Sequence, residues 1–316
     1  MLLGAHLSIA GGLCEALRAA RKYRFETLAL FVRNQRQWAA PPLAHEAAEE
    51  FRSLRRRLGI GPVVAHGSYL LNLAGEPTVR RKSLAALAED LRRCGRLGIE
   101  YLVIHPGSRA DAGEGMRLIA EGLREALAAA TAAASPAPEA AAASGATAPA
   151  GCAGPAILLE TTSGAGHSIG GRFEELAEIL ALAGAPAGPD ARRVGAGEAG
   201  APRLGVCLDT CHVFAAGYDL RTPHAYAQTM ARLDAAVGLW RLKAVHLNDS
   251  LGDLGSRLDR HAHIGKGRLG LAAFANLVRD ERLAGVPLLL ETPKGKDRRG
   301  RDWDRVNAGA IRRLAR

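Results

Sequence analysis

The chain has 316 residues and a formal net charge of +10, and hydrophobic residues make up 48% of it. This length allows one large domain or two smaller ones, and the apolar fraction suits a protein with a packed core. Because no run of about 18 apolar residues occurs, a membrane-spanning helix is not expected. The positive charge favours a polyanionic partner such as nucleic acid, although many basic proteins bind none.

Short apolar runs alternate with amphipathic stretches along the chain, as in parallel strands joined by helices. The apolar runs predict eight strands, over residues 2–6, 27–31, 62–66, 101–105, 156–160, 204–209, 242–246 and 286–291. The other stretches predict eight helices, over residues 13–22, 43–58, 78–97, 115–133, 172–182, 223–237, 271–280 and 303–314. Thr78 is the expected N-cap of its helix, and Pro223 suits a first helical turn. Eight repeats predict a (β/α)₈ TIM barrel, with a doubly wound open sheet as the alternative.

Two segments interrupt this alternation. Residues 134–153 are nearly all Ala, Pro, Ser, Gly and Thr, and residues 183–202 are rich in Gly, Ala and Pro. Neither composition can bury enough apolar surface to order itself, so we expect two disordered insertions. The stretch between them is too short for a usual domain, so residues 1–316 are expected to form a single domain.

The N-terminal residues and the cysteines indicate where the protein works. The N-terminus lacks a basic segment followed by a long apolar one, so we interpret it as a strand and not as a secretion signal. The five cysteines are odd in number and scattered, which suggests neither a disulfide framework nor a cysteine-type zinc site. We therefore expect buried free thiols and a cytoplasmic protein, lying with the nucleoid if the source is bacterial, and a monomer.

Six consecutive predicted strands end in a residue that can bind metal. These residues are His66, His105, Glu160, Asp209, His246 and Glu291. In a barrel, the carboxyl ends of the strands converge on the face where active sites of this fold lie. Three carboxylates there would repel one another, and bound divalent cations remove that repulsion. A mixed set of imidazoles and carboxylates suits zinc, with manganese or iron as alternatives.

Three further candidate ligands lie in the loops that follow these strands. His212 comes three residues after Asp209, and Asp259 and His261 lie two residues apart. That spacing turns both side chains of an extended segment to the same side. The nine candidates suffice for two or three metal ions. His6 also ends a predicted strand, and we interpret it as a supporting or structural residue.

Several short motifs accompany these ligands. They are NQRQW at 34–38, HGSYL at 66–70, HPGS at 105–108, GVCLDTCH at 205–212, HLND at 246–249 and DRH at 259–261. On these motifs the chain resembles the endonuclease IV family, from Gly4 to Pro293 and outside the two insertions. Two positions depart from the family pattern: Gly67 stands where an aspartate is known, and Lys266 where a glutamate is common.

The resemblance implies a TIM barrel that binds three zinc ions per chain, with manganese as the alternative at one site. The first zinc would be held by His66, His105 and Glu160. Glu160 would bridge to the second, and the remaining ligands of that ion would be Asp209, His246 and Glu291. The third would be held by His212, Asp259 and His261.

The resemblance also implies an activity. A member of this family is an AP endonuclease (deoxyribonuclease IV) of DNA repair, which hydrolyses the phosphodiester 5′ to an abasic site in double-stranded DNA. It leaves a 3′-hydroxyl and trims blocked 3′ ends. Glu160 and Glu291 are the expected catalytic residues. Divalent cations lower the pKa of water toward neutrality, and Glu291 is expected to orient that water between the ions that Glu160 bridges.

The same resemblance implies which residues recognise the lesion. Arg36 and Tyr69, assisted by Leu70, align with residues that enter the duplex at the lesion in this family. An abasic nucleotide lacks stacking, so extruding it costs less than for an intact nucleotide, and an aromatic or apolar wedge can hold the gap. Without the resemblance, Tyr69 would be interpreted as packing on the end of the barrel and Arg36 as a phosphate contact.

Two other functions compete with this one. The first is a metal-dependent sugar isomerase or epimerase on a related barrel, which handles a small neutral substrate. Five histidine ligands, the net charge of +10 and the motif at 34–38 argue against it. The second is a DNA-binding module without catalysis, and the complete set of nine ligands argues against that.

Overall fold

The computed structural model describes residues 1–132, 154–185 and 203–316. Its central sheet has eight parallel strands, as predicted. These are β1 (Leu2–Ala5), β2 (Leu28–Phe31), β3 (Val63–His66), β4 (Tyr101–Ile104), β6 (Ala156–Glu160), β8 (Leu204–Asp209), β9 (Leu242–Leu247) and β12 (Pro287–Leu290). Each pairs with the strand that follows it along the chain, from β2 to β12, and β12 pairs with β1.

The sheet closes where β1 meets β2. His6 forms a parallel bridge with Ala29, and the Leu7 amide donates a hydrogen bond of 2.8 Å to the Ala29 carbonyl. The Glu26 amide donates to the Leu3 carbonyl at 3.0 Å, next to the same seam. This closure makes the sheet a TIM barrel, so the prediction is confirmed and the alternative of an open sheet is wrong.

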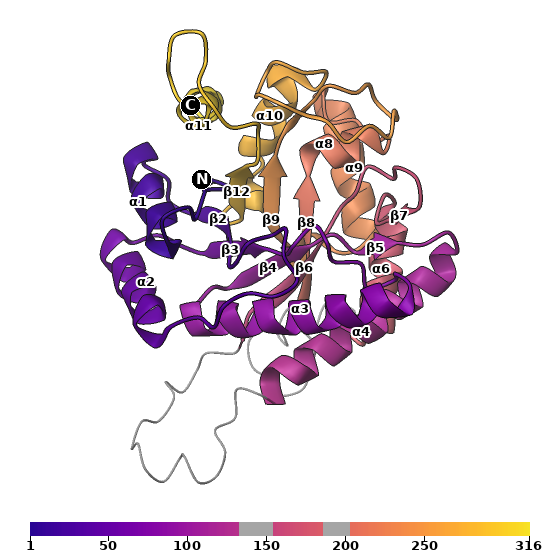
Figure 1. Cartoon of the computed structure of the whole chain (residues 1–316). Helices are drawn as coiled ribbons and strands as arrows, with labels where there is room; N and C mark the ends of the chain where they lie inside the picture. Colours follow the sequence, from indigo (N-terminus) through magenta and orange to yellow (C-terminus); the bar gives the residue numbers. More distant parts are fainter. Residues whose placement is uncertain (133–153, 186–202) are drawn as a thin grey trace.

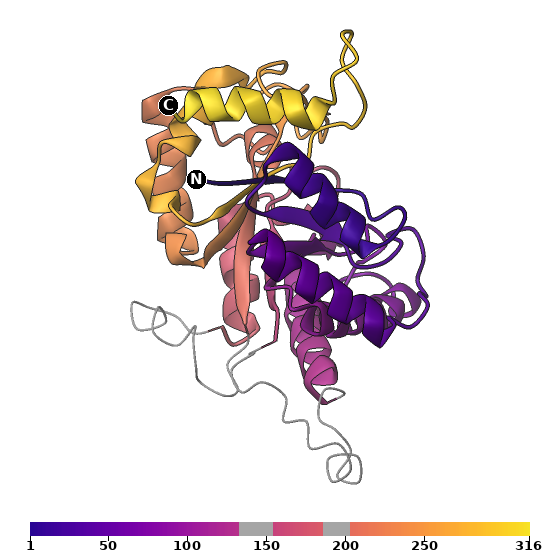
Figure 2. The ribbon, with the colours of Figure 1, turned by 90° about the vertical axis from the view of Figure 1, so that its left-hand side faces the viewer.

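Helices surround the barrel (Figure 1). All eight predicted helices form, and α8 and the short pairs of strands in the loops are additional. The helices are α1 (Leu13–Tyr23), α2 (His45–Leu58), α3 (Pro77–Leu97), α4 (Ala112–Ala132), α6 (Phe173–Leu182), α8 (Thr210–Ala215), α9 (Pro223–Ala236), α10 (Gly270–Val278) and α11 (Trp303–Leu314). Figures 1 and 2 both show α11 beside the N-terminal end of β1.

The apolar residues of the strands divide between two cores because successive side chains of a strand point to opposite faces. One set fills the barrel, with one residue from each of seven strands. These are Ala29, Val64, Val103, Leu158, Cys207, Ala244 and Leu289. The alternate strand residues, such as Leu3, Leu30 and Leu290, pack with the helices in a larger outer core.

Some details differ from the predictions. Helix α3 begins at Pro77 after Glu76, so Thr78 is not its N-cap, whereas Pro223 does open α9 behind a capping Thr222. Ala183 and Ala185 are buried beside α6, so the second insertion begins later than predicted. The rest of both insertions lies outside the described residues, as does Cys152.

The other four cysteines are free and buried, as expected. Within the described ranges, no helix combines the length and apolar character needed to cross a membrane.

Gly4 allows the close approach of β1 to β2. A Cβ atom at Gly4 would lie 2.3 Å from the carbonyl oxygen of Thr27, which is backbone and cannot move aside. We therefore expect Gly4→Ala to lower the free energy of unfolding by about 1–3 kcal/mol through overpacking. Thermal or urea denaturation measures this change.

Gly95→Ala is the matched control, because Gly95 is exposed on α3 and an added Cβ would meet no atom within 4 Å. This variant should be neutral or more stable by up to ~1 kcal/mol. If the two variants unfolded alike, the seam would not require a glycine.

Candidate metal centre

The barrel brings all nine predicted ligands to the carboxyl ends of its strands. His66, Glu160 and Asp209 are the last residues of β3, β6 and β8, and His246 is the second-last residue of β9. His105 and Glu291 follow β4 and β12 directly, and His212 lies in α8. His261 is the first residue of the short strand β11 (His261–Ala262), and Asp259 lies two residues before it. Each of the nine residues belongs to at least one group in which every member offers one ligand atom, and these atoms lie within 4.8 Å of one another.

Glu160 lies at the middle of the site and is fully buried. Its Oε2 atom is 3.1 Å from His66 Nε2 and 3.3 Å from His105 Nε2. Its Oε1 atom is 2.8 Å from His246 Nδ1. Each oxygen of the carboxylate therefore faces a different set of imidazoles, which is the arrangement of a bridging ligand.

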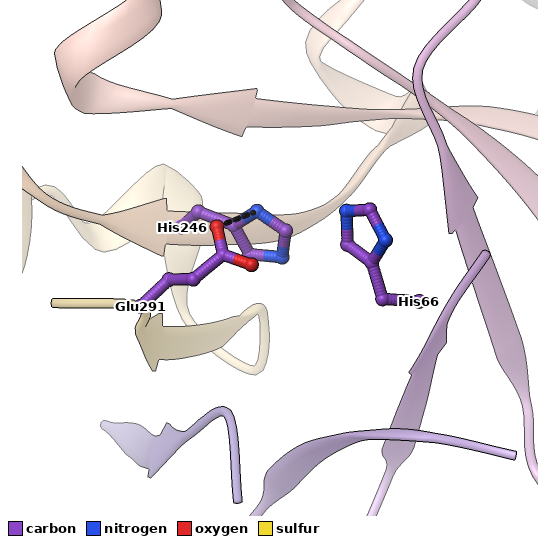
Figure 3. Close-up of side chains that lie close together, drawn as sticks. All are labelled: His66, His246 and Glu291. Carbon is purple, nitrogen blue, oxygen red and sulfur yellow. Dashed lines mark ion pairs between the residues drawn. The ribbon is translucent and has the colours of Figure 1, made fainter. Parts of the chain in front are cut away.

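A second group shares Glu160 with the first. It contains Glu160, Asp209, His246 and Glu291. His246 Nδ1 is 3.3 Å from Glu291 Oε2 (Figure 3). His66 faces this pair from β3, with its ring centroid 5.8 Å from that of His246. The first and second groups are thus adjacent.

The third group lies on the other side of Asp209. His212 Nε2 is 3.2 Å from Asp259 Oδ2, and His261 Nε2 is 3.4 Å from Asp259 Oδ1. Asp209 Oδ2 is 3.9 Å from His261 Nε2, so this carboxylate lies between the second and third groups. The three groups form one continuous cluster.

Hydrogen bonds fix the orientation of these ligands. His66 Nδ1 lies 2.7 Å from the Gly67 carbonyl, and His212 Nδ1 lies 2.8 Å from that of Thr161, which leaves each Nε2 atom facing the cluster. Bonds of this kind set the tautomer and the direction of a metal-binding histidine. Asp209 Oδ1 accepts from the His212 amide at 2.8 Å and so caps α8.

Sequence reasoning missed two supporting residues. Asn248 Nδ2 donates to Asp209 Oδ2 at 2.5 Å, and the Thr161 hydroxyl accepts from the Asp209 amide at 2.9 Å. Asn248 belongs to the HLND motif at 246–249, which is the signal that could have indicated it. Thr161 follows Glu160 without any such signal.

Cys211 also approaches the site, in a group with Asp209 and His261. Burial and the nearby Asp209 carboxylate raise the pKa of the Cys211 thiol to about 12. This environment favours the neutral thiol in the metal-free protein, whereas the thiolate is the form that binds metals.

The charges of the site indicate divalent cations. In the part of the chain that the structure describes, the ion pairs of Glu160, Asp209, Asp259 and Glu291 are all with imidazoles and none with Lys or Arg. Buried carboxylates need a compensating positive charge. Clustered imidazoles and carboxylates can both bind a divalent cation, so the donor set fits metal ions.

Without metal ions, protonated histidines would supply part of this compensation. Burial opposes the charged form of His212, but Asp209, Asp259 and Glu160 together raise its pKa to about 10. Burial also opposes ionisation of Glu160, yet His246 and His105 hold its pKa well below the usual range. A cation that binds to these imidazoles must displace their protons.

His6 lies next to the site but belongs to none of the groups. Its ring centroid is 4.5 Å from that of Phe31 and 6.2 Å from that of His66. Burial lowers its pKa well below the usual value, so the ring is neutral.

The three predicted DNA-contacting residues are exposed on the loops that follow β2 and β3. Tyr69 is 60% exposed and Leu70 is 36% exposed. The Tyr69 ring centroid lies 5.5 Å from that of His66 and 5.6 Å from that of Phe31, so one edge packs on the barrel and the rest is free. Arg36 is exposed on the loop after β2.

Comparison with known proteins defines the class first. Residues 17–314 match the family described as xylose isomerase-like TIM barrel. Solved barrels of sugar epimerases share this fold, such as the D-psicose 3-epimerase of Clostridium cellulolyticum H10, with a TM-score of 0.62 at 14% identity over 100% of this chain and 98% of its own. At that identity the likeness concerns the fold alone.

Closer relatives define the family. The probable endonuclease 4 of Chloroflexus aurantiacus is 43% identical over 98% of this chain and 97% of its own length. The apurinic-apyrimidinic endonuclease of Caenorhabditis elegans is 40% identical over 93% of this chain and 67% of its own length. The crystal structure of endonuclease IV from Thermus thermophilus has a TM-score of 0.79 at 35% identity and covers 99% of this chain and 98% of its own. The chain belongs to the endonuclease IV family.

The division of the ligands into three groups predicts how many metal ions each variant keeps. Glu160→Ala removes a carboxylate shared by two groups, whereas Asp259→Ala removes a ligand of the third group alone. We expect three divalent ions per chain in the unaltered protein, two in Asp259→Ala and one in Glu160→Ala. Elemental analysis by mass spectrometry after dialysis counts them.

Asp297→Ala is the control, since Asp297 pairs with Arg301 and belongs to none of the ligand groups. This variant should keep the full metal content. An equal loss from Glu160→Ala and Asp259→Ala would show that Glu160 is not shared.

Proposed function

We propose that this protein is a zinc-dependent AP endonuclease. It hydrolyses the phosphodiester 5′ to an abasic site in double-stranded DNA, leaves a 3′-hydroxyl and trims blocked 3′ ends. The observation that carries this proposal is the continuous cluster of three ligand groups with the exposed Tyr69 packed against its ligand His66. The endonuclease names of the full-length relatives support it.

Zinc suits the five imidazoles and four carboxylates, with manganese as the alternative at one site. His66, His105 and Glu160 would hold the first ion, and Glu160, Asp209, His246 and Glu291 the second. His212, Asp259 and His261 would hold the third. When bound, such ions polarise the phosphate and lower the pKa of water toward about 7.

Two glutamates have distinct catalytic tasks. Glu160 is fully buried and holds the first two ligand groups at a fixed separation. The side chain of Glu291 is 14% exposed, so water and substrate can reach its carboxylate. Glu291 therefore orients the attacking water, which must lie in line with the leaving 3′-oxygen.

Arg36, Tyr69 and Leu70 recognise the lesion. Their side chains are exposed on the loops that follow β2 and β3, and the Tyr69 ring lies 5.5 Å from the ring of His66. A wedge at this position fills the gap in the stack while the abasic sugar enters the site. The net charge of +10 attracts the DNA backbone.

A sugar epimerase and a DNA-binding module without catalysis remain the competing functions. An epimerase has no use for an exposed aromatic and arginine pair beside the site. A module that only binds DNA has no need for nine converging ligands, whose burial is costly. Both alternatives therefore explain less of the site.

Cleavage of a duplex with one abasic site tests the proposal. Chelation should abolish nicking, and added zinc should restore it. Glu160→Ala should slow nicking by at least about a thousandfold, or ~4 kcal/mol of barrier. Glu178→Ala, on the exposed side of α6, should match the unaltered protein. Full activity of a metal-free preparation would refute the metal mechanism.

Recognition can be separated from metal chemistry with the variant Arg36→Ala combined with Tyr69→Ala. It should keep its full zinc content and bind the abasic duplex more weakly, by about 1–3 kcal/mol for the stacking contact. The slope of the logarithm of the binding constant against the logarithm of the salt concentration should fall by about one unit, since one cation is lost.

The same double variant should lose less activity on a blocked 3′ end at a nick than on the abasic duplex, because less unstacking is needed there. Loss of zinc together with equal losses on both substrates would mean that these residues support the barrel instead of reading the lesion.

A further inference from the structure

The loop that carries Arg36 is irregular, yet buried charges hold its base. Arg33 and Asp90 are 5% and 1% exposed, and they form an ion pair beneath this loop. Arg33 Nε is 2.5 Å from Asp90 Oδ1, and Arg33 Nη2 is 3.3 Å from Asp90 Oδ2. Such a paired contact fixes the plane of the guanidinium group.

The remaining nitrogen of Arg33 holds the far side of the loop. Its Nη1 atom donates to the carbonyls of Gln37 at 2.5 Å and Trp38 at 3.3 Å. Arg93, one turn after Asp90 on α3, donates to the carbonyls of Val32 and Pro41. Together the two arginines bind the beginning and the end of the loop over residues 32–41.

Ser68 joins this loop to the one that carries Tyr69. Its hydroxyl donates to the Gln35 carbonyl at 2.6 Å and accepts from the Leu70 amide at 3.2 Å. Gln35 directly precedes Arg36, and Ser68 directly precedes Tyr69. This one hydroxyl therefore links the two loops next to their exposed residues. Ser68 itself is only 7% exposed.

These contacts are a costly way to stabilise a barrel. Replacing a buried ion pair by apolar side chains is often neutral or stabilising, so stability alone gives little reason for Arg33 and Asp90. Holding a binding loop in its bound conformation, in contrast, removes the entropic cost of ordering it on association.

We propose that Arg33, Asp90, Arg93 and Ser68 are positioning residues that hold Arg36 and Tyr69 at a fixed separation before DNA binds. This inference rests on the proposed function for its consequence in lesion binding. The arrangement itself is a property of the free protein, so it can be measured without DNA.

Hydrogen–deuterium exchange of the DNA-free, metal-loaded protein is the first test. Ser68→Ala should speed exchange of the amides at 35–38 and 69–71, by up to about tenfold for the loss of one hydrogen-bonding group. Arg33→Lys keeps a charge against Asp90 but loses the planar fork, and it should speed exchange at 36–38.

Thr229→Val is the matched control. Thr229 is buried on α9, and its hydroxyl donates to the Asp219 carbonyl at 2.8 Å, away from the site. This variant should leave exchange in both loops unchanged.

Kinetics on the abasic duplex is the second test. Ser68→Ala should raise KM by up to about tenfold and leave kcat and zinc content within about twofold, because the hydroxyl bonds to the Gln35 carbonyl and the Leu70 amide and to none of the nine ligands. The rise should be smaller on a blocked 3′ end at a nick. A variant that merely destabilised the barrel would lose kcat and zinc as well.

Unchanged exchange in both loops of Ser68→Ala, or equal KM changes in Ser68→Ala and Thr229→Val, would overturn the inference. Faster exchange in Ser68→Ala, with no cleavage of abasic DNA by the unaltered protein, would support the link between the loops and refute the proposed function.

Discussion

The burial of carboxylates at one end of the barrel is the constraint on which the rest of this site depends. Glu160 and Asp209 are fully buried, and within the described ranges imidazoles are the groups that form ion pairs with them. Such charge is stable only if cations bind between the groups or the histidines take up protons. The histidines must therefore converge, and the hydrogen bonds of His66 and His212 to backbone carbonyls aim them. The same arrangement that makes the site costly to fold prepares it for divalent ions.

The sequence was sufficient to predict the barrel, its strands and the residues at their carboxyl ends. Strands buried on both faces are short continuous apolar runs, and a polar residue such as His66 or Glu160 marks where the run stops. The convergence of these residues then follows from the topology of the fold, without any knowledge of side-chain geometry.

What the sequence could not provide depends on contacts between distant residues. Helix α8 has only six residues, fewer than two turns, so its apolar residues cannot show a repeating helical pattern, and it begins where Asp209 caps it. The bond from Asn248 to Asp209 joins residues 39 positions apart, and that from Ser68 to Gln35 joins residues 33 apart. The start of the second insertion was misplaced because Ala183 and Ala185 look like loop residues in composition but pack beside α6.

The spread of the ligands along the chain has a consequence for protein synthesis. The first group draws on residues 66 to 160, whereas the second needs Glu291, which follows the last strand of the barrel. The barrel closes only when β12 pairs with β1, so a partly synthesised chain has neither the closed barrel nor the complete cluster. A nuclease built in this way acquires its full set of ligands only when translation of the barrel is complete. Truncated products of an interrupted synthesis would lack the means to cut the chromosome.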